Sequence, residues 1–86
     1  MVGVSQWAVA GGEDAEDNNV EIWSTFADAW AYAYPEGQGW NVFKRADIEA
    51  EFIAGARRIC IAWIGAEPPG DDAQESMFAV FIERLD

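Results

Sequence analysis

Six consecutive apolar residues occupy positions 59–64 and read Ile59-Cys60-Ile61-Ala62-Trp63-Ile64. Both alternating faces of this stretch are apolar, and half of its members are β-branched. Strands with one exposed face alternate apolar and polar residues, whereas strands buried on both faces do not. The stretch therefore predicts a central strand that is covered on both sides or packed tightly on one.

The segment before this strand has the features of a helix. Asp47 is placed to cap its start, and Arg57 and Arg58 fall in its last turn, where positive charge complements the helix dipole. The expected inner face consists of Ile48, Phe52, Ile53 and Ala56.

The segment after the strand contains a long acidic connection over residues 65–76 and then a second apolar stretch. Residues 77–85 alternate, with Phe78, Val80 and Ile82 on one face, which predicts the last strand.

The N-terminal half predicts a strand, an acidic loop and a helix. Residues 2–10 favour a strand that ends at two glycines, and residues 13–19 are packed with like charges, as in an exposed loop. Residues 20–34 repeat apolar side chains at helical spacing, after a capping box formed by Asn18 and Glu21. A competing interpretation makes residues 19–23 a strand and starts the helix at Ser24 or Thr25.

A short strand over residues 40–44 completes the order βαβαββ within one domain spanning residues 1–86. We expect an α+β fold in which two helices pack on one face of a small, mainly antiparallel sheet, because that arrangement buries both helical stripes.

The charge of the chain is high and unevenly distributed. The net charge is −11; residues 1–43 carry seven acids and no base, and residues 44–86 carry nine acids and five bases. Such a surface repels nucleic acid and anionic membranes and attracts basic protein surfaces. We therefore expect no direct binding to nucleic acid and no membrane role.

Compartment and catalysis are constrained by what the sequence lacks. The single cysteine, Cys60, cannot form an internal disulfide, and the N-terminus lacks a secretion signal, so a cytoplasmic protein is expected. The chain has no histidine, and Cys60 lies in the most apolar strand, where a thiol is a poor nucleophile. We expect neither an enzyme nor a cofactor.

A metal site is not expected either. Asp17, Asn19, Glu21 and Asp28 echo a calcium loop, but Ile22 stands where that loop requires glycine.

Aromatic residues are candidates for partner contact. Of the five tryptophans, Trp23, Trp30 and Trp63 fit core positions, while Trp40 follows a glycine-containing turn and is the one most expected at the surface. Tyr32 falls on the outer face of the expected helix. Exposed aromatic side chains often anchor protein interfaces.

The acidic residues are the second group of candidates for partner contact. They are interpreted either as a solvated surface that keeps the protein soluble or as a binding site. The expected partner-binding set, with the two aromatics, is Glu13, Asp14, Glu16, Asp17, Glu21, Asp28, Tyr32, Trp40, Asp47, Glu51, Asp71, Asp72 and Glu75.

In its size, its charge, its missing catalytic groups and its loop-borne acids, the chain resembles the small acidic phage inhibitors, which include anti-CRISPR proteins and other DNA mimics. The resemblance implies that carboxylates stand in for phosphates and block a basic nucleic-acid-binding protein or CRISPR effector complex in the cytoplasm of a bacterial host. The alternative is a non-catalytic adaptor or oligomerising subunit, such as a homodimer formed through a sheet edge, whose acidity serves solubility.

Overall fold

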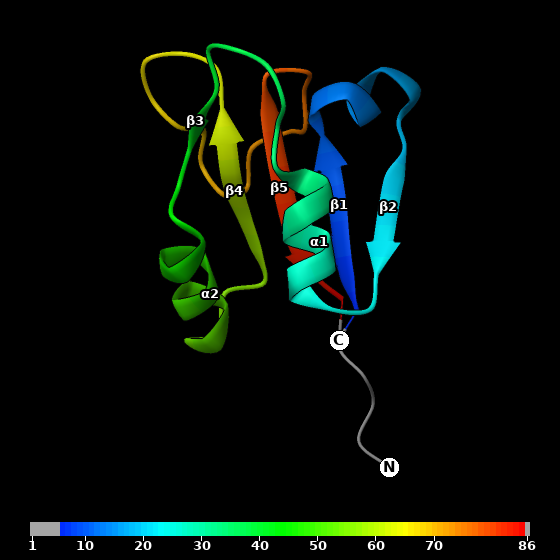
Figure 1. The fold of residues 1–86 in the computed structure, drawn as a ribbon, viewed down its shortest axis with the longest axis vertical. Coiled ribbons are helices and arrows are strands. Elements are labelled where there is room, and N and C mark those ends of the chain that lie inside the picture. The colour runs from blue at the N-terminus through cyan, green and yellow to red at the C-terminus, as the bar shows by residue number, and fades with distance from the viewer. Residues whose placement is uncertain (1–5, 86) are drawn as a thin grey trace.

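A computed structural model describes residues 6–85, without the side chains of Asp14 and Glu16. One antiparallel sheet has the strand order β2-β1-β5-β4-β3 (Figure 1). Its strands are β1 (Trp7–Gly11), β2 (Val20–Trp23), β3 (Asn41–Val42), β4 (Arg58–Trp63) and β5 (Ala79–Arg84). The helices are the 3-10 helix η1 (Gly12–Asp17) and the α-helices α1 (Phe26–Ala33) and α2 (Arg45–Ile53). The expected α+β fold is confirmed.

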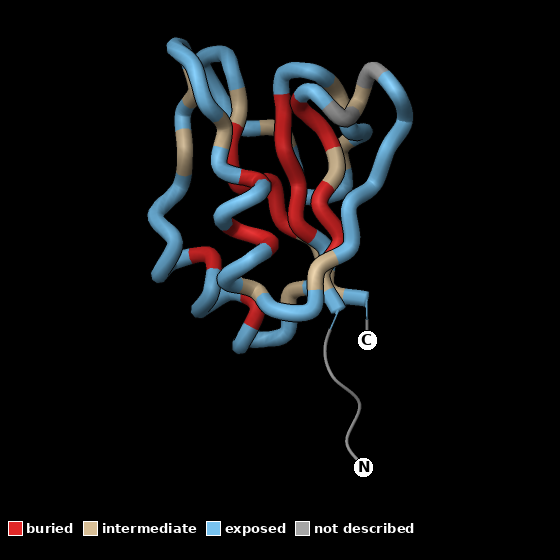
Figure 2. Tube along the Cα trace, turned by 45° about the vertical axis from the view of Figure 1, so that its right-hand side comes forward, coloured by how far each residue is buried: buried red, intermediate tan, exposed pale blue. Residues whose placement is uncertain are grey.

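Both α-helices contribute to one hydrophobic core on the same face of the sheet. Trp30 of α1 and Phe52 of α2 pack in one cluster with Val9, Ile61 and Ile82 from three neighbouring strands. Figure 2 shows the buried residues concentrated along the inner strands and the sheet-facing sides of the helices. The core therefore fixes both helices relative to the strands.

The stretch around residues 59–64 is an inner strand covered on both sides, as expected. In β4, Ile59 and Ile61 belong to the helix-side core, whereas Cys60 packs with Phe81 on the far face of the sheet. The connection between β4 and β5, residues 64–78, covers this part of the far face through the partly buried Ala73.

Arg58 fastens that connection to the far face. Its Nη1 atom donates hydrogen bonds to the carbonyl oxygens of Asp71 and Ala73, at 2.6 and 2.8 Å, and its guanidinium lies 3.9 Å from the centre of the Phe81 ring. The Cys60 amide donates to Asp71 Oδ1 at 3.3 Å. The connection is thus held by specific contacts despite its length.

Residues 20–23 form a strand, so the preferred interpretation of residues 20–34 as one helix is wrong and the competing one is correct. β2 pairs with β1 along its whole length, which satisfies backbone groups that a helix would have paired internally. The helix cap is Thr25, whose Oγ1 accepts a hydrogen bond from the Asp28 amide at 3.1 Å, rather than the box formed by Asn18 and Glu21.

The second helix begins and ends earlier than expected. Its N-cap is Lys44, and Asp47 lies in the first turn instead of capping it. Gly55 adopts φ 116° after the last turn, and the amides of Gly55 and Ala56 donate to the carbonyl groups of Phe52 and Glu51 in a Schellman arrangement. Arg57 and Arg58 therefore lie outside the helix, and Ile53 is 82% exposed instead of facing the core.

Two further elements differ from expectation. The last strand begins at Ala79, which leaves Met77 and Phe78 exposed before it. The acidic segment after β1 folds into η1 instead of remaining an open loop. Residues 2–5 of the first expected strand lie outside the described part of the chain.

The Cys60 thiol is buried, as the sequence predicted. Burial raises the pKa of this thiol above its ordinary value, and the nearby Asp71 carboxylate raises it further, while backbone hydrogen bonding with Ala62 and the charge of Arg58 act in the opposite direction. Within residues 6–85, no helix has the length and apolar character to cross a membrane.

Candidate functional site

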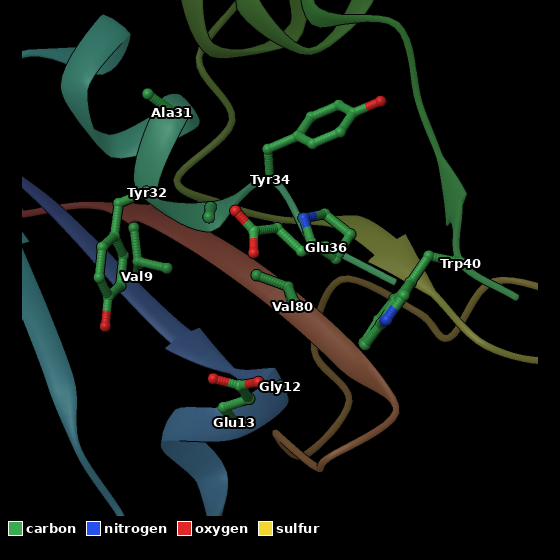
Figure 3. A pocket seen from close by; sticks show the side chains of 12 residues that line it. Val9, Gly12, Glu13, Ala31, Tyr32, Tyr34, Glu36, Trp40 and Val80 are labelled. Carbon is green, nitrogen blue, oxygen red and sulfur yellow. The ribbon is translucent and has the colours of Figure 1, made fainter. Parts of the chain in front are cut away.

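A hollow of about 390 Å³ opens where β1 and α1 end, beside the segment of residues 35–40 (Figure 3). Val9 and Val80 of the sheet lie between its walls, together with the backbone of Gly11 and Gly12. Small-molecule sites in proteins occupy about 300–1,000 Å³. The hollow is therefore large enough to admit a long side chain of another protein.

Two glycines shape the strand end beside the hollow. Gly11 has φ 95°, and a side chain there would collide with the carbonyl oxygen of Ala79. Gly12 has φ 62°, and its amide donates to the Ser76 carbonyl at 2.9 Å. Only glycine combines this backbone conformation with so close an approach to β5.

Aromatic side chains stand at two opposite sides of the hollow. Figure 3 shows Tyr32 on one side and Trp40 on the other, with Val80 between them. The Tyr32 ring lies 5.2 Å from the Trp23 ring, and Trp40 packs partly against the main core. Both rings are therefore positioned by contacts within the fold while each keeps a surface toward the hollow.

Carboxylates line the other two sides. Glu13, from η1, and Glu36, after Pro35, are exposed residues of the lining, and they approach Val80 from opposite directions in Figure 3. Except for Val80, every residue of the lining comes from the half of the chain that has no lysine or arginine.

The C-terminal end of α1 adds to the negative potential of the hollow. Residues 31–34, which line it, form the end of this helix, and its last turn carries no base. The end of a helix bears roughly half a negative charge because its last carbonyl groups have no partner within the helix. Two carboxylates and a helix end therefore converge on one concave site.

The five bases lie at the opposite end of the sheet. Lys44 directly precedes α2, and Arg45 is its first residue. Arg57 directly precedes β4, whose first residue is Arg58, and Arg84 is the last residue of β5. Arg84 Nη1 donates to the Phe52 carbonyl at 3.1 Å, and the Arg45 guanidinium lies 5.8 Å from the centre of the Phe26 ring. We call this the mixed-charge end, because Asp47, Glu49, Glu51 and Glu83 accompany these bases.

The opposite end, called here the acidic end, combines the hollow with η1 and the last part of the β4–β5 connection. Asp17 is the last residue of η1. The hydrogen bond from the Gly12 amide to the Ser76 carbonyl places the β4–β5 connection beside the start of η1, and Glu75 directly precedes Ser76. Asp14 and Glu16 also belong to η1, although their side chains lie outside the described part.

The structure brings together only some of the residues expected to contact a partner. Glu13, Tyr32 and Trp40 share the hollow. Glu21 lies in β2 opposite Val9, on the strand next to it. The remaining expected residues lie elsewhere: Asp28 at the start of α1, Asp47 and Glu51 on α2, and Asp71 and Asp72 in the β4–β5 connection.

Asp71 has a structural contact that the sequence did not indicate. Its carboxylate accepts the hydrogen bond from the Cys60 amide, and its carbonyl accepts one from Arg58. Charge reversal at this position would remove the acceptor of the Cys60 amide, so it would alter the fold as well as any binding surface. Glu75, which lies near η1, is the better probe of this connection.

Sequence reasoning missed Glu36 and the role of the two glycines. Glu36 lies between Pro35 and Gly37, two residues after Tyr34, the C-cap of α1. The sequence does not separate Glu36 from the other exposed acids, because only the packing of distant segments places it beside the hollow. The Tyr34 ring itself points away from Val80 in Figure 3.

The chemistry of the site favours binding of a cation by rings and carboxylates. Among the described residues, no three side chains of the metal-binding types gather as a metal site would require. Aromatic faces and carboxylates both attract organic cations.

No protein-family model, curated protein or solved structure matches this chain.

Proposed function

We propose that the chain is a non-catalytic inhibitor that binds a basic nucleic-acid-binding protein through its acidic end. The observation that carries this proposal is the separation of charge: the bases lie at the mixed-charge end, several of them in contact with the protein itself, whereas the acidic end has a hollow lined by Glu13 and Glu36. Opposite charges on two protein surfaces accelerate association and orient the partners.

The proposed mechanism is replacement of phosphates by carboxylates. Duplex DNA carries one negative charge per about 1.7 Å of helix axis, and proteins that grip it present lysine and arginine side chains to the phosphates. CRISPR effector complexes hold nucleic acid in positively charged channels, so they are the target class we propose. Occupation of such a channel by the acidic end would exclude the nucleic acid.

Tyr32 and Trp40 supply the apolar part of the proposed contact. Tyr32 is 40% exposed and Trp40 is half-buried, so both rings have surface available to a partner. Interfaces take much of their affinity from a few such aromatic side chains. Charge would then set the rate of association, while the rings would slow dissociation.

The test begins by capturing partners from a bacterial lysate with this protein as bait. Affinity for the captured protein is then measured at about 50 and 200 mM salt, with and without that protein's nucleic acid. We expect binding that weakens with salt and competes with the nucleic acid. The variant Glu13→Lys/Asp17→Lys should weaken binding by about 30-fold or more, since charged contacts contribute roughly 1–3 kcal/mol each.

The matched control is Glu49→Lys/Glu51→Lys, which changes the net charge equally at the mixed-charge end and should weaken binding much less. Binding that is insensitive to salt and tolerates bound nucleic acid would contradict the proposal. Equal losses from the two variants would show that net charge alone, and not the acidic end, attracts the partner.

A second candidate function, the adaptor that pairs through a sheet edge, is favoured by β2. This strand ends the sheet, and its residues Val20 and Ile22 are each 49% exposed. Edge strands with exposed apolar side chains are templates for pairing with another chain. Sedimentation velocity separates the candidates: a dimer that Ile22→Lys dissociates supports the adaptor, and a monomer at all concentrations opposes it.

A further inference from the structure

We infer that the hollow at the acidic end is a receptor for a single arginine side chain of the partner. This inference deepens the proposed function, because it assigns a chemical group to the site by which a basic protein would bind. It rests on three features of the lining: two carboxylates, two aromatic rings and the C-terminal end of α1.

The negative groups select a cation over a neutral or anionic ligand. Glu13 and Glu36 approach from opposite sides, and residues 31–34 add the negative end of the α1 dipole. A cation in the hollow would be attracted from three directions without competition from a base of the lining, which contains none.

The aromatic rings select a guanidinium over an ammonium. Arginine has a planar, weakly hydrated head that stacks on rings and presents five donors, whereas lysine has a compact, strongly hydrated charge. Tyr32 and Trp40 offer rings at two sides, while the carboxylates and the helix end offer acceptors. Val9 and Val80 provide an apolar surface on which the methylene stem of arginine packs.

The glycines at the end of β1 keep the hollow open to such a long side chain. Gly11 and Gly12 belong to the lining, and Gly12 would bring a side chain to 3.1 Å from Val80 Cγ2 if it carried one. Glycine at position 12 therefore leaves the space beside Val80 unfilled in the folded chain.

The inference is tested with the whole chain and a short peptide, acetyl-Gly-Arg-Gly-amide. The control peptide contains citrulline, which has nearly the shape of arginine but no charge. Proton–nitrogen NMR spectra are recorded during titration with each peptide. We expect saturable shifts of the Trp40 indole signal and of the amides of residues 11–13, 31–34 and 36 with arginine, weaker shifts with a lysine peptide, and none with citrulline.

Two double variants with the same change in net charge test whether the arginine peptide binds at the hollow. Glu13→Gln/Glu36→Gln should weaken arginine binding by about tenfold, and Glu49→Gln/Glu51→Gln, with the same change in net charge, should leave it within about twofold. All four positions are exposed, so both variants are expected to fold, and circular dichroism verifies this. Shifts spread evenly over the acidic surface, or equal shifts with citrulline, would overturn the inference.

The inference and the proposed function can fail separately. If a captured partner competes with nucleic acid but binds Glu13→Gln/Glu36→Gln as well as the unaltered protein, the arginine receptor is refuted and the inhibitor remains. If the arginine peptide binds the hollow but no partner competes with nucleic acid, the receptor remains and the inhibitor is refuted.

Discussion

At the mixed-charge end, Arg58 and Arg84 donate hydrogen bonds to carbonyl groups of the protein itself, whereas at the acidic end Glu13 and Glu36 line a hollow. The arginines close the fold: Arg58 fastens the β4–β5 connection, and Arg84 joins the end of β5 to α2. Charged groups that satisfy internal partners contribute to stability, while charged groups on a concave surface are available to a ligand. Changes at the two arginines should therefore alter the stability of the fold, whereas changes at the two glutamates should alter binding.

The largest expected effect on stability comes from adding a side chain at Gly11, where β1 approaches β5 at the acidic end. Gly11→Ala places a side chain against the Ala79 carbonyl in a conformation with positive φ. We expect the free energy of unfolding to fall by about 3 kcal/mol or more, because β1 and β5 must separate to relieve the collision. Urea unfolding followed by circular dichroism measures the loss.

Gly39→Ala is the control for this change, because Gly39 has φ 89° but no atoms within 4 Å of an added Cβ. It should cost only the backbone strain, about 1–2 kcal/mol. Equal losses in the two variants would mean that the close approach of Gly11 to β5 contributes nothing, and that the hollow is not held by this contact.

A smaller effect is expected from releasing the far-face connection at the mixed-charge end. Arg58→Met keeps an apolar stem over Phe81 but removes the donors to Asp71 and Ala73. The free energy of unfolding should fall by about 2 kcal/mol, since hydrogen bonds to charged groups contribute roughly 1.5–3 kcal/mol. The buried thiol of Cys60 should also react faster with a thiol reagent under native conditions, because the connection covers it.

Arg57→Met removes the same charge from the neighbouring exposed residue and is the control. It should leave both the unfolding energy and the labelling of Cys60 nearly unchanged. If both variants behave alike, the contacts of Arg58 do not hold the connection, and the contrast between structural arginines and available carboxylates loses one of its two supports.

The sequence predicted the elements whose patterns are strong and failed where tertiary contacts decide. Residues 59–64 predicted an inner strand because only a strand covered by other elements buries apolar side chains on both of its faces, and β4 agrees with that prediction to within one residue at each end. Residues 20–23 continue the helical period of the following residues, which favoured a helix, but pairing with β1 makes them a strand. Gly55 was a readable stop signal for α2, whereas the extra turn of helix expected after it rested on charge at Arg57 and Arg58.

The candidate site was predicted less well for a physical reason. Glu13, Tyr32 and Trp40 are far apart in the chain and were named separately, but only the close approach of β1 to β5 and the course of residues 35–40 brings them around one hollow. Glu36 had the same composition signal as many other exposed acids. A sequence gives the kind of side chain at each position, and concavity arises only when distant segments are packed.

The smallest expected effect is on the dependence of stability on salt. The unaltered protein should gain stability as salt rises, because the acids of residues 1–43 have no internal counter-charge and their repulsion is screened over about 10 Å at 0.1 M salt. Thermal unfolding at low and high salt measures this gain, which should stay below about 1 kcal/mol since exposed charges interact weakly.

Neutral variants sharpen the comparison between the two ends. Glu13→Gln/Glu36→Gln removes two acids that repel each other across the hollow, so it should raise stability at low salt and reduce the gain from added salt. Glu49→Gln/Glu51→Gln removes two acids from the end that holds all five bases, and Glu49 lines the same small cavity as Arg84, so stability at low salt should stay constant or fall. Identical dependence of stability on salt in the two variants would show that only the net charge of the protein matters, and not where the charges lie. The separation of charge along the sheet would then contribute nothing to stability, and a basic partner would have no electrostatic reason to bind at the acidic end.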